Sequence, residues 1–148
     1  MASTFLSLHY HIVFSTKHRQ AILHDSWRFR LFEYLGGTVH GLAGIPECIG
    51  GWTDHIHLLV GLKATHPLAD FVRELKKSGT SWIQTEIGMR DFAWQEGYAA
   101  FTVSPTARDS VKAYIDHQGE HHRTRSFREE LVEFLQKAGV EYEDKYLD

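Results

Sequence analysis

Cysteine is nearly absent from this chain, since Cys48 is the only one among 148 residues. One cysteine excludes a disulfide framework and a metal site built on thiolates. It is also typical of proteins in a reducing compartment, so we expect a cytoplasmic protein. The start of the chain lacks a basic segment followed by an uninterrupted apolar run, so no signal peptide is expected. No apolar stretch is long enough to span a bilayer, which needs about 20 residues.

The chain also lacks a large excess of charge of either sign, because its formal net charge is −3. The acidity is concentrated in residues 129–148, which hold seven acidic and two basic residues. Without that segment the chain has 14 basic and 12 acidic residues, and is therefore slightly basic. With 43% hydrophobic residues it can bury a substantial core, and its length predicts a single domain over residues 1–148.

Hydrophobic patterning predicts four strands and four helices in one compact unit. Strands are expected at residues 5–16, 45–52, 55–62 and 98–104, with a tight turn at Thr53-Asp54 joining the second and third as a hairpin. Helices are expected from an Asp25 N-cap, after Pro67, from a Ser104 cap with Pro105 in the first turn, and from a Ser126 cap to Gly139. The order of the first six elements predicts an α+β fold, the ferredoxin-like βαββαβ arrangement (RRM-like), with an antiparallel sheet and two C-terminal helices.

The third predicted strand carries two histidines, His55 and His57, in an otherwise apolar segment. Residues two apart share one face of a strand, so both imidazoles point the same way, about 7 Å apart. Two unpaired imidazoles on a buried strand would cost desolvation energy, and a metal ion would satisfy both. A bare pair of this kind is also found on sheet surfaces or hydrogen-bonded in a core, and the pair alone leaves these interpretations open.

A second group lies on the helix expected after Ser104. Tyr114 and Gln118 are four residues apart and therefore share a helix face, in a stripe with Val111, Ile115 and His122. The plain interpretation is an amphipathic helix that packs its tyrosine in the core. A glutamine in an apolar stripe needs partners, however, and a metal ion is one partner for its carbonyl oxygen.

Together the two groups suggest phosphoryl-transfer chemistry. Two imidazoles and one amide oxygen would leave coordination positions open on a hard divalent ion that also holds phosphate oxygens. Tyr114 would then be a nucleophile, and the product would be a phosphotyrosine that keeps the energy of the phosphodiester.

Basic residues that could contact the phosphates of a nucleic acid lie in three segments, one of which follows the tyrosine helix and holds Arg123 and Arg125. A solvated surface is the alternative interpretation for each segment. The candidates for DNA binding are Lys17 and Arg19 after the first strand, and Arg73, Lys76 and Lys77 on the second helix.

Five segments in order resemble the single-tyrosine HUH transposases of bacterial insertion sequences, the insertion sequence 200/605 group (IS200-like). They extend over nearly the whole chain, from Tyr10 to Leu147. The segments are YHIVFSTKHRQAIL, DHIHLLVGL, WQEGYAAFTVS, VKAYIDHQGEHHR and SFREELVEFLQKAGVEYEDKYL.

The resemblance implies a metal-dependent transposase that nicks and rejoins single-stranded DNA at hairpin-marked element ends. It implies Mg²⁺ or Mn²⁺ bound by His55, His57 and Gln118, and a 5′-phosphotyrosine link formed by Tyr114, which frees a 3′-hydroxyl. It also implies a homodimer in which the tyrosine helix of one chain usually completes the histidine site of the other.

Other functions share part of this pattern. A domesticated HUH endonuclease acting on chromosomal hairpin repeats would use the same residues. A replication initiator or relaxase would normally carry a further domain. A noncatalytic nucleic-acid-binding ferredoxin-like module would need no nucleophile, and a zinc hydrolase would need a carboxylate base, for which Asp54 is the candidate nearest in sequence.

Overall fold

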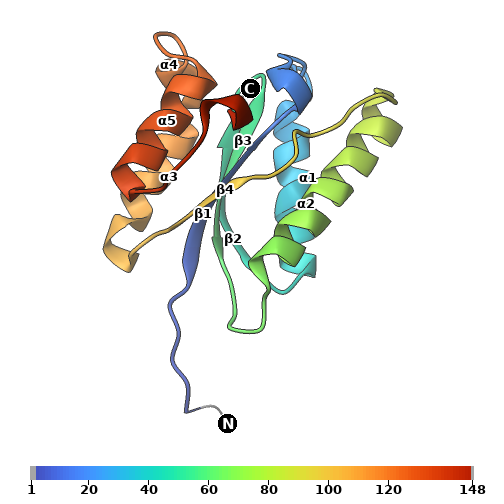
Figure 1. Cartoon of the computed structure of the whole chain (residues 1–148). Helices are drawn as coiled ribbons and strands as arrows, with labels where there is room; N and C mark the ends of the chain where they lie inside the picture. The colour runs from blue at the N-terminus through green and yellow to red at the C-terminus, as the bar shows by residue number, and fades with distance from the viewer. Residues whose placement is uncertain (1–2, 148) are drawn as a thin grey trace.

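The computed structural model describes residues 3–147 and contains one four-stranded antiparallel sheet (Figure 1). The strands lie in the order β2-β3-β1-β4, so β1 and β3 are the central neighbours. This order confirms the predicted α+β class and the ferredoxin-like arrangement. The strand bounds are His9–Ser15 for β1, Ile45–Gly51 for β2, His55–Gly61 for β3 and Ala99–Thr102 for β4.

Helices cover both faces of the sheet, which makes three layers (Figure 1). On one side lie α1 (Arg28–Gly41) and α2 (Leu68–Trp82). On the other lie α3 (Arg108–Asp116), the single turn α4 (Gln118–His121) and α5 (Phe127–Ala138). Among residues 3–147, no helix is both long enough and apolar enough to cross a membrane.

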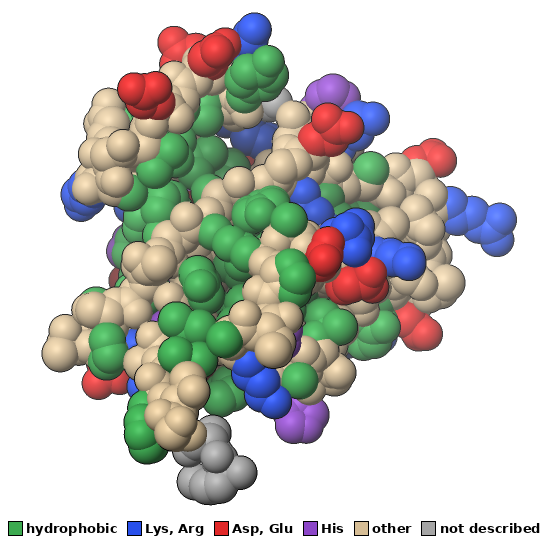
Figure 2. All heavy atoms as spheres, turned by 60° about the horizontal axis from the view of Figure 1, so that its bottom comes forward, with side chains coloured by type: hydrophobic (Ala, Val, Ile, Leu, Met, Phe, Trp, Pro, Cys, Tyr) green, Lys and Arg blue, Asp and Glu red, His purple; other side chains and the backbone are tan. Residues whose placement is uncertain are grey.

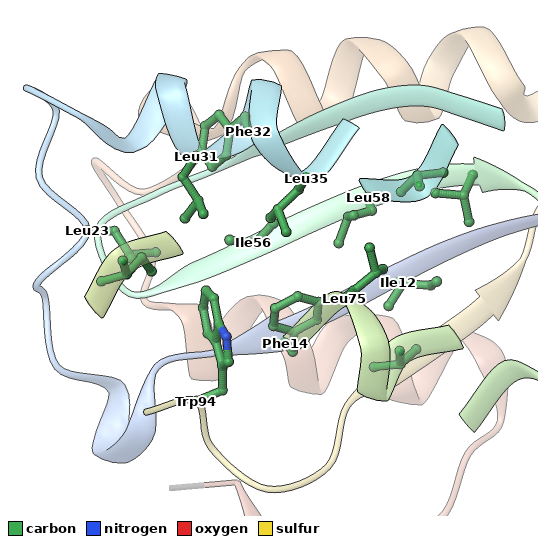
Figure 3. Close-up of a cluster of buried hydrophobic side chains, with 14 of the residues drawn as sticks. Ile12, Phe14, Leu23, Leu31, Phe32, Leu35, Ile56, Leu58, Leu75 and Trp94 are labelled. Carbon is green, nitrogen blue, oxygen red and sulfur yellow. The ribbon is translucent and has the colours of Figure 1, made fainter. Parts of the chain in front are cut away.

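The main core fills the space between the sheet and the α1–α2 layer (Figure 3). Alternate residues of the strands form the sheet side of this core, because residues i and i+2 point to the same face of a strand. The helices meet that surface with leucines at helical spacing. The core includes Ile12, Phe14, Ile56, Leu58, Leu31, Leu35 and Leu75, each no more than 2% exposed.

The predicted caps are partly confirmed. Ser126 forms a full capping box at the start of α5, and Gly139 ends that helix in the left-handed conformation. Asp25 does not cap α1, because the chain first makes a turn that bonds the amides of Trp27 and Arg28 to the carbonyl of His24.

The single helix predicted from Ser104 to His122 is wrong in its continuity. Ser104 occupies the N-cap position of a 3₁₀ turn, Pro105–Ala107, but its hydroxyl contacts the hydroxyl of Thr106 and caps no amide. The helix then breaks at His117 (φ −107°, ψ 29°), which separates α3 from α4. Tyr114 and Gln118 therefore lie on either side of a break.

Candidate active site

Strand β3 is buried on both faces, and its histidines face away from the main core. Ile56 and Leu58 point toward α1 and α2, so His55 and His57 point toward α3 and α5, and both are 0% exposed. A second, smaller apolar cluster of Leu59 and Ile115 continues this face beneath α3. The histidines are therefore enclosed, which excludes the interpretation of two surface histidines.

Helix α3 is fixed on the edge strand β2 by close backbone packing and by ion pairing. A Cβ atom built on Gly50 would lie 2.7 Å from the carbonyl oxygen of Ile115, so only glycine fits the observed spacing. Near the start of α3, Arg108 pairs with Glu47, whose carboxylate also bonds His9 at 2.7 Å. This docking places the side chains of α3 against histidines of the same chain.

Gln118 reaches the first histidine directly. His55 Nε2 lies 2.8 Å from Gln118 Oε1, and His122 Nε2 lies 3.0 Å from the same oxygen. The break at His117 is what turns Gln118 inward, where it is only 2% exposed. The structure thus brings together all four residues predicted from sequence: His55, His57, Gln118 and Tyr114.

Glu130 on α5 lies at the centre of this group, although the sequence analysis did not select it. Its Oε1 is 2.9 Å from His57 Nε2 and 3.3 Å from His55 Nε2. Its Oε2 accepts hydrogen bonds from the Tyr114 hydroxyl and, at 3.2 Å, from Gln118 Nε2. With 1% exposure, this carboxylate is removed from water and depends on these contacts.

Each imidazole turns Nε2 inward and has a partner on its other nitrogen. His55 Nδ1 bonds Asp54 Oδ1 at 2.7 Å, and His122 Nδ1 donates to the carbonyl of Arg125 at 2.9 Å. His57 Nδ1 bonds His11 Nε2 at 2.7 Å. Outer partners of this type fix the tautomer and orientation of histidines that bind metals.

The donor atoms are close enough to share an ion. One donor atom from each of His55, His122 and Glu130 lies within 4.8 Å of the others. His57 is outside that set of three but touches it through Glu130, and the Gln118 oxygen lies between His55 and His122. The group that could hold a metal is therefore His55, His122 and Glu130, and ligation by His57 and Gln118 stays a prediction.

Charges in the site are strongly coupled. Burial lowers the pKa of His57 to about 4 despite its bond to Glu130, and burial beside His57 lowers the pKa of His11 to about 3. Burial also disfavours the charged form of His55, but hydrogen bonds to Asp54 and Glu130 outweigh it and raise its pKa to about 9. Burial alone would raise the pKa of Glu130, yet its bonds to the histidines hold that pKa far below the usual range.

Tyr114 has its hydroxyl between a negative and a positive partner. It donates to Glu130, and it accepts a hydrogen bond of 2.6 Å from Arg125 Nη2. Burial and the bond to Glu130 raise the pKa of Tyr114, while Arg125 acts in the opposite direction. In this chain Tyr114 lies against its own histidines. The expectation of a tyrosine helix shared between two chains stays a prediction.

The basic residues predicted to bind DNA are separated from this site. Arg73, Lys76 and Lys77 lie on α2, on the opposite face of the sheet (Figure 1). Lys76 donates to the carbonyls of Gln95 and Gly97, and Arg73 pairs with Asp70. Lys17 and Arg19 lie in a 3₁₀ turn directly after β1.

Over the face drawn in Figure 2, Lys and Arg side chains alternate with Asp and Glu and do not gather into one basic patch. The contact of these residues with DNA therefore stays a prediction.

Two residues that the sequence analysis missed carry a recognisable signal. Glu130 follows Phe127 by three positions and precedes Phe134 by four, so it interrupts the apolar stripe of α5. The concentration of acidic residues at the C-terminus hid it among solvated side chains. His11 follows the strand alternation toward the same face as His57, opposite to Ile12.

Comparisons with known proteins give a family match and two similar folds. Residues 4–118 match the family described as Transposase IS200 like. Among curated proteins no significant match was found.

Two solved structures share the fold. The crystal structure of a proposed transposase from Deinococcus radiodurans R1 is 24% identical, with a TM-score of 0.67, covering 80% of this chain and 95% of that one. The structure of the REP-associated tyrosine transposase bound to a REP hairpin is 14% identical, with a TM-score of 0.61, covering 82% of this chain and 73% of that one. The family match extends over more than half of the sequence and includes His55, His57, Tyr114 and Gln118, so this chain belongs to the IS200-like transposase family.

Proposed function

We propose that this transposase-family protein nicks and rejoins single-stranded DNA at hairpin-marked ends through a 5′-phosphotyrosine intermediate on Tyr114. The observation that carries the proposal is the position of the Tyr114 hydroxyl, which shares the Glu130 carboxylate with the two β3 histidines. A tyrosine packed only as a core residue would not need its hydroxyl bonded to a buried carboxylate and to an arginine.

The donor set fits a divalent ion. Inward Nε2 atoms and outer partners on Nδ1 are the arrangement of metal-binding histidines, and Gln118 and Glu130 add the oxygen donors that Mg²⁺ and Mn²⁺ prefer. His55, His57, Gln118 and Glu130 would hold the ion, with His122 as a further donor. When bound, the ion polarises the phosphate and orients it for in-line displacement.

The residues of this chain then account for the covalent step. Attack of Tyr114 Oη on phosphorus forms a P–Oη bond and breaks the P–O3′ bond, so the leaving group becomes a 3′-hydroxyl. The phenolic proton leaves along the existing hydrogen bond to Glu130 Oε2, which passes it on to water, and the departing O3′ takes a proton from water. The reverse reaction with another 3′-hydroxyl would rejoin the strand, and no nucleotide cofactor is required.

DNA with hairpins is the proposed partner. The solved REP-associated tyrosine transposase is bound to a REP hairpin, and it shares this fold. The domesticated-endonuclease alternative would use the same chemistry on chromosomal repeats. A homodimer is part of the proposal, with Lys17 and Arg19, in the turn after β1, among the candidate phosphate contacts.

The test is formation of a covalent adduct. The protein is incubated with labelled single-stranded oligonucleotides from the DNA flanking its own gene, with Mg²⁺ or Mn²⁺ or with chelator, and resolved on a denaturing gel. We expect a metal-dependent DNA–protein band that disappears with Tyr114→Phe and His55→Ala. It should persist with Tyr146→Phe and His40→Ala, which change exposed residues outside the site. Binding without a covalent band would favour the noncatalytic module.

A further inference from the structure

Arg125 is a charged residue in contact with the proposed nucleophile, and the sequence alone suggests for it only a general phosphate contact. It lies in the loop between α4 and α5, beyond residues 4–118 that match the family. Its Nη2 donates to Tyr114 Oη at 2.6 Å, while its Nη1 pairs with Glu133 on α5. Its side chain is 25% exposed, so the guanidinium is partly shielded from water.

The Arg125 guanidinium is held in a fixed direction because both of its terminal nitrogens, Nη1 and Nη2, have partners. Glu133 fixes one nitrogen, and Lys137 Nζ bonds the other oxygen of Glu133 at 2.8 Å. The backbone of Arg125 is also anchored, because its carbonyl accepts from His122. A positive group placed in advance at a developing negative charge costs no reorganisation during the reaction.

A cavity of about 220 Å³ opens beside this contact. Tyr114 and Arg125 line it together with Glu133 and Lys137, and Val111 and Phe134 supply apolar walls. Its volume is below the about 300–1,000 Å³ of pockets for drug-sized ligands. It can therefore admit one phosphodiester with part of a sugar beside the tyrosine oxygen.

We propose that Arg125 is a second catalytic residue, which binds the oxygen of Tyr114 as the P–Oη bond forms and breaks, and contacts the scissile phosphate that enters this cavity. In the forward step the guanidinium stabilises negative charge on Oη and on the phosphate oxygens. In the reverse step it stabilises the departing tyrosine oxygen. The inference rests on the proposed phosphotyrosine chemistry and adds a group that acts in both directions.

The experiment measures adduct formation at saturating oligonucleotide in a single turnover, with Mn²⁺ present, for the wild type, Arg125→Ala, Arg125→Lys and Arg128→Ala. Removing one donor to a developing charge lowers rates by about 10²–10³-fold. We expect a loss of this size for Arg125→Ala. We expect a smaller loss for Arg125→Lys, and none for Arg128→Ala, whose side chain pairs with Asp144 on the surface. Binding of the same oligonucleotide, measured in a Tyr114→Phe background, should change less than about threefold, because most phosphate contacts lie elsewhere.

Added guanidinium separates a chemical role from a structural one. It should partly restore the rate of Arg125→Ala and leave Tyr114→Phe inactive. An Arg125→Ala rate equal to that of Arg128→Ala would overturn the inference while leaving the proposed function intact, as would a loss that guanidinium does not restore. A wild-type protein that forms no adduct would overturn the proposed function and this inference with it.

Discussion

Replacing Gly50 by alanine should separate the tyrosine helix from the sheet. The new Cβ would lie 2.7 Å from the carbonyl oxygen of Ile115 and 2.8 Å from its Cγ2 atom. Ordinary contact begins at 3.4 Å, so α3 must retreat from β2 by roughly 0.7 Å. Overpacking of this kind costs about 1–3 kcal/mol, which corresponds to a fall in melting temperature of about 2–4 °C per kcal/mol for a chain of this length.

The same substitution should reduce catalysis, because Tyr114 adjoins the displaced residue. A misplacement near 1 Å can cost about 10²-fold in rate, so we expect Gly50→Ala to slow adduct formation by about one order of magnitude or more. Urea denaturation and the adduct assay measure the two effects.

A matched control comes from Gly37 in α1, where an added Cβ meets nothing within 4 Å. Gly37→Ala should stabilise the protein by about 0.5–1 kcal/mol and leave adduct formation unchanged. If Gly50→Ala were as stable and as fast as the wild type, α3 would not be docked on its own sheet as described.

Two further predictions concern local contacts. Ser126→Ala should destabilise the protein by about 1 kcal/mol because it removes the capping box of α5. Ser104→Ala should cost little because that hydroxyl caps no amide. The midpoints of urea denaturation compare the two variants, and equal losses of stability would contradict this assignment of the caps. Burial and the hydrogen bond to Asp116 raise the pKa of the Cys48 thiol to about 12, so it stays protonated at pH 8. Iodoacetamide should therefore label the native protein far more slowly than the unfolded one at that pH, and similar rates would refute the contact between Cys48 and Asp116.

The regular helices and strands could be predicted from sequence because the spacing of their apolar residues matches the faces that are buried in the structure. Strand alternation around Ile56 and Leu58 places the histidines on one face and the core on the other, and the Ser126 box marks a helix start from four residues. The break at His117 was not predicted, because Gly119, two residues later, is a weak signal and the break depends on how Gln118 packs against His55.

The candidate site was predictable only in its short-range pairs. His55 and His57 are two residues apart on one strand, so local geometry relates them, whereas Tyr114 and Gln118 are close in sequence but lie on either side of the break at His117. Glu130 meets His57 across 73 positions of sequence, and only tertiary packing of α5 brings them together. Its acidic neighbours made a solvent-exposed interpretation reasonable until its place in the apolar stripe was considered.

The position of Glu130 and Arg125 after the histidines and Tyr114 in the sequence also bears on the order in which the site assembles during synthesis. Ribosomes deliver the chain from its N-terminus, so β3 and its histidines leave the exit tunnel well before α5 does. Until α5 docks, the imidazoles lack the carboxylate that they share in the finished protein, and Tyr114 lacks both partners of its hydroxyl. A chain synthesised only as far as α4 would thus carry the family's recognisable residues without an assembled site, and the proposed strand cutting would wait until α5 docks.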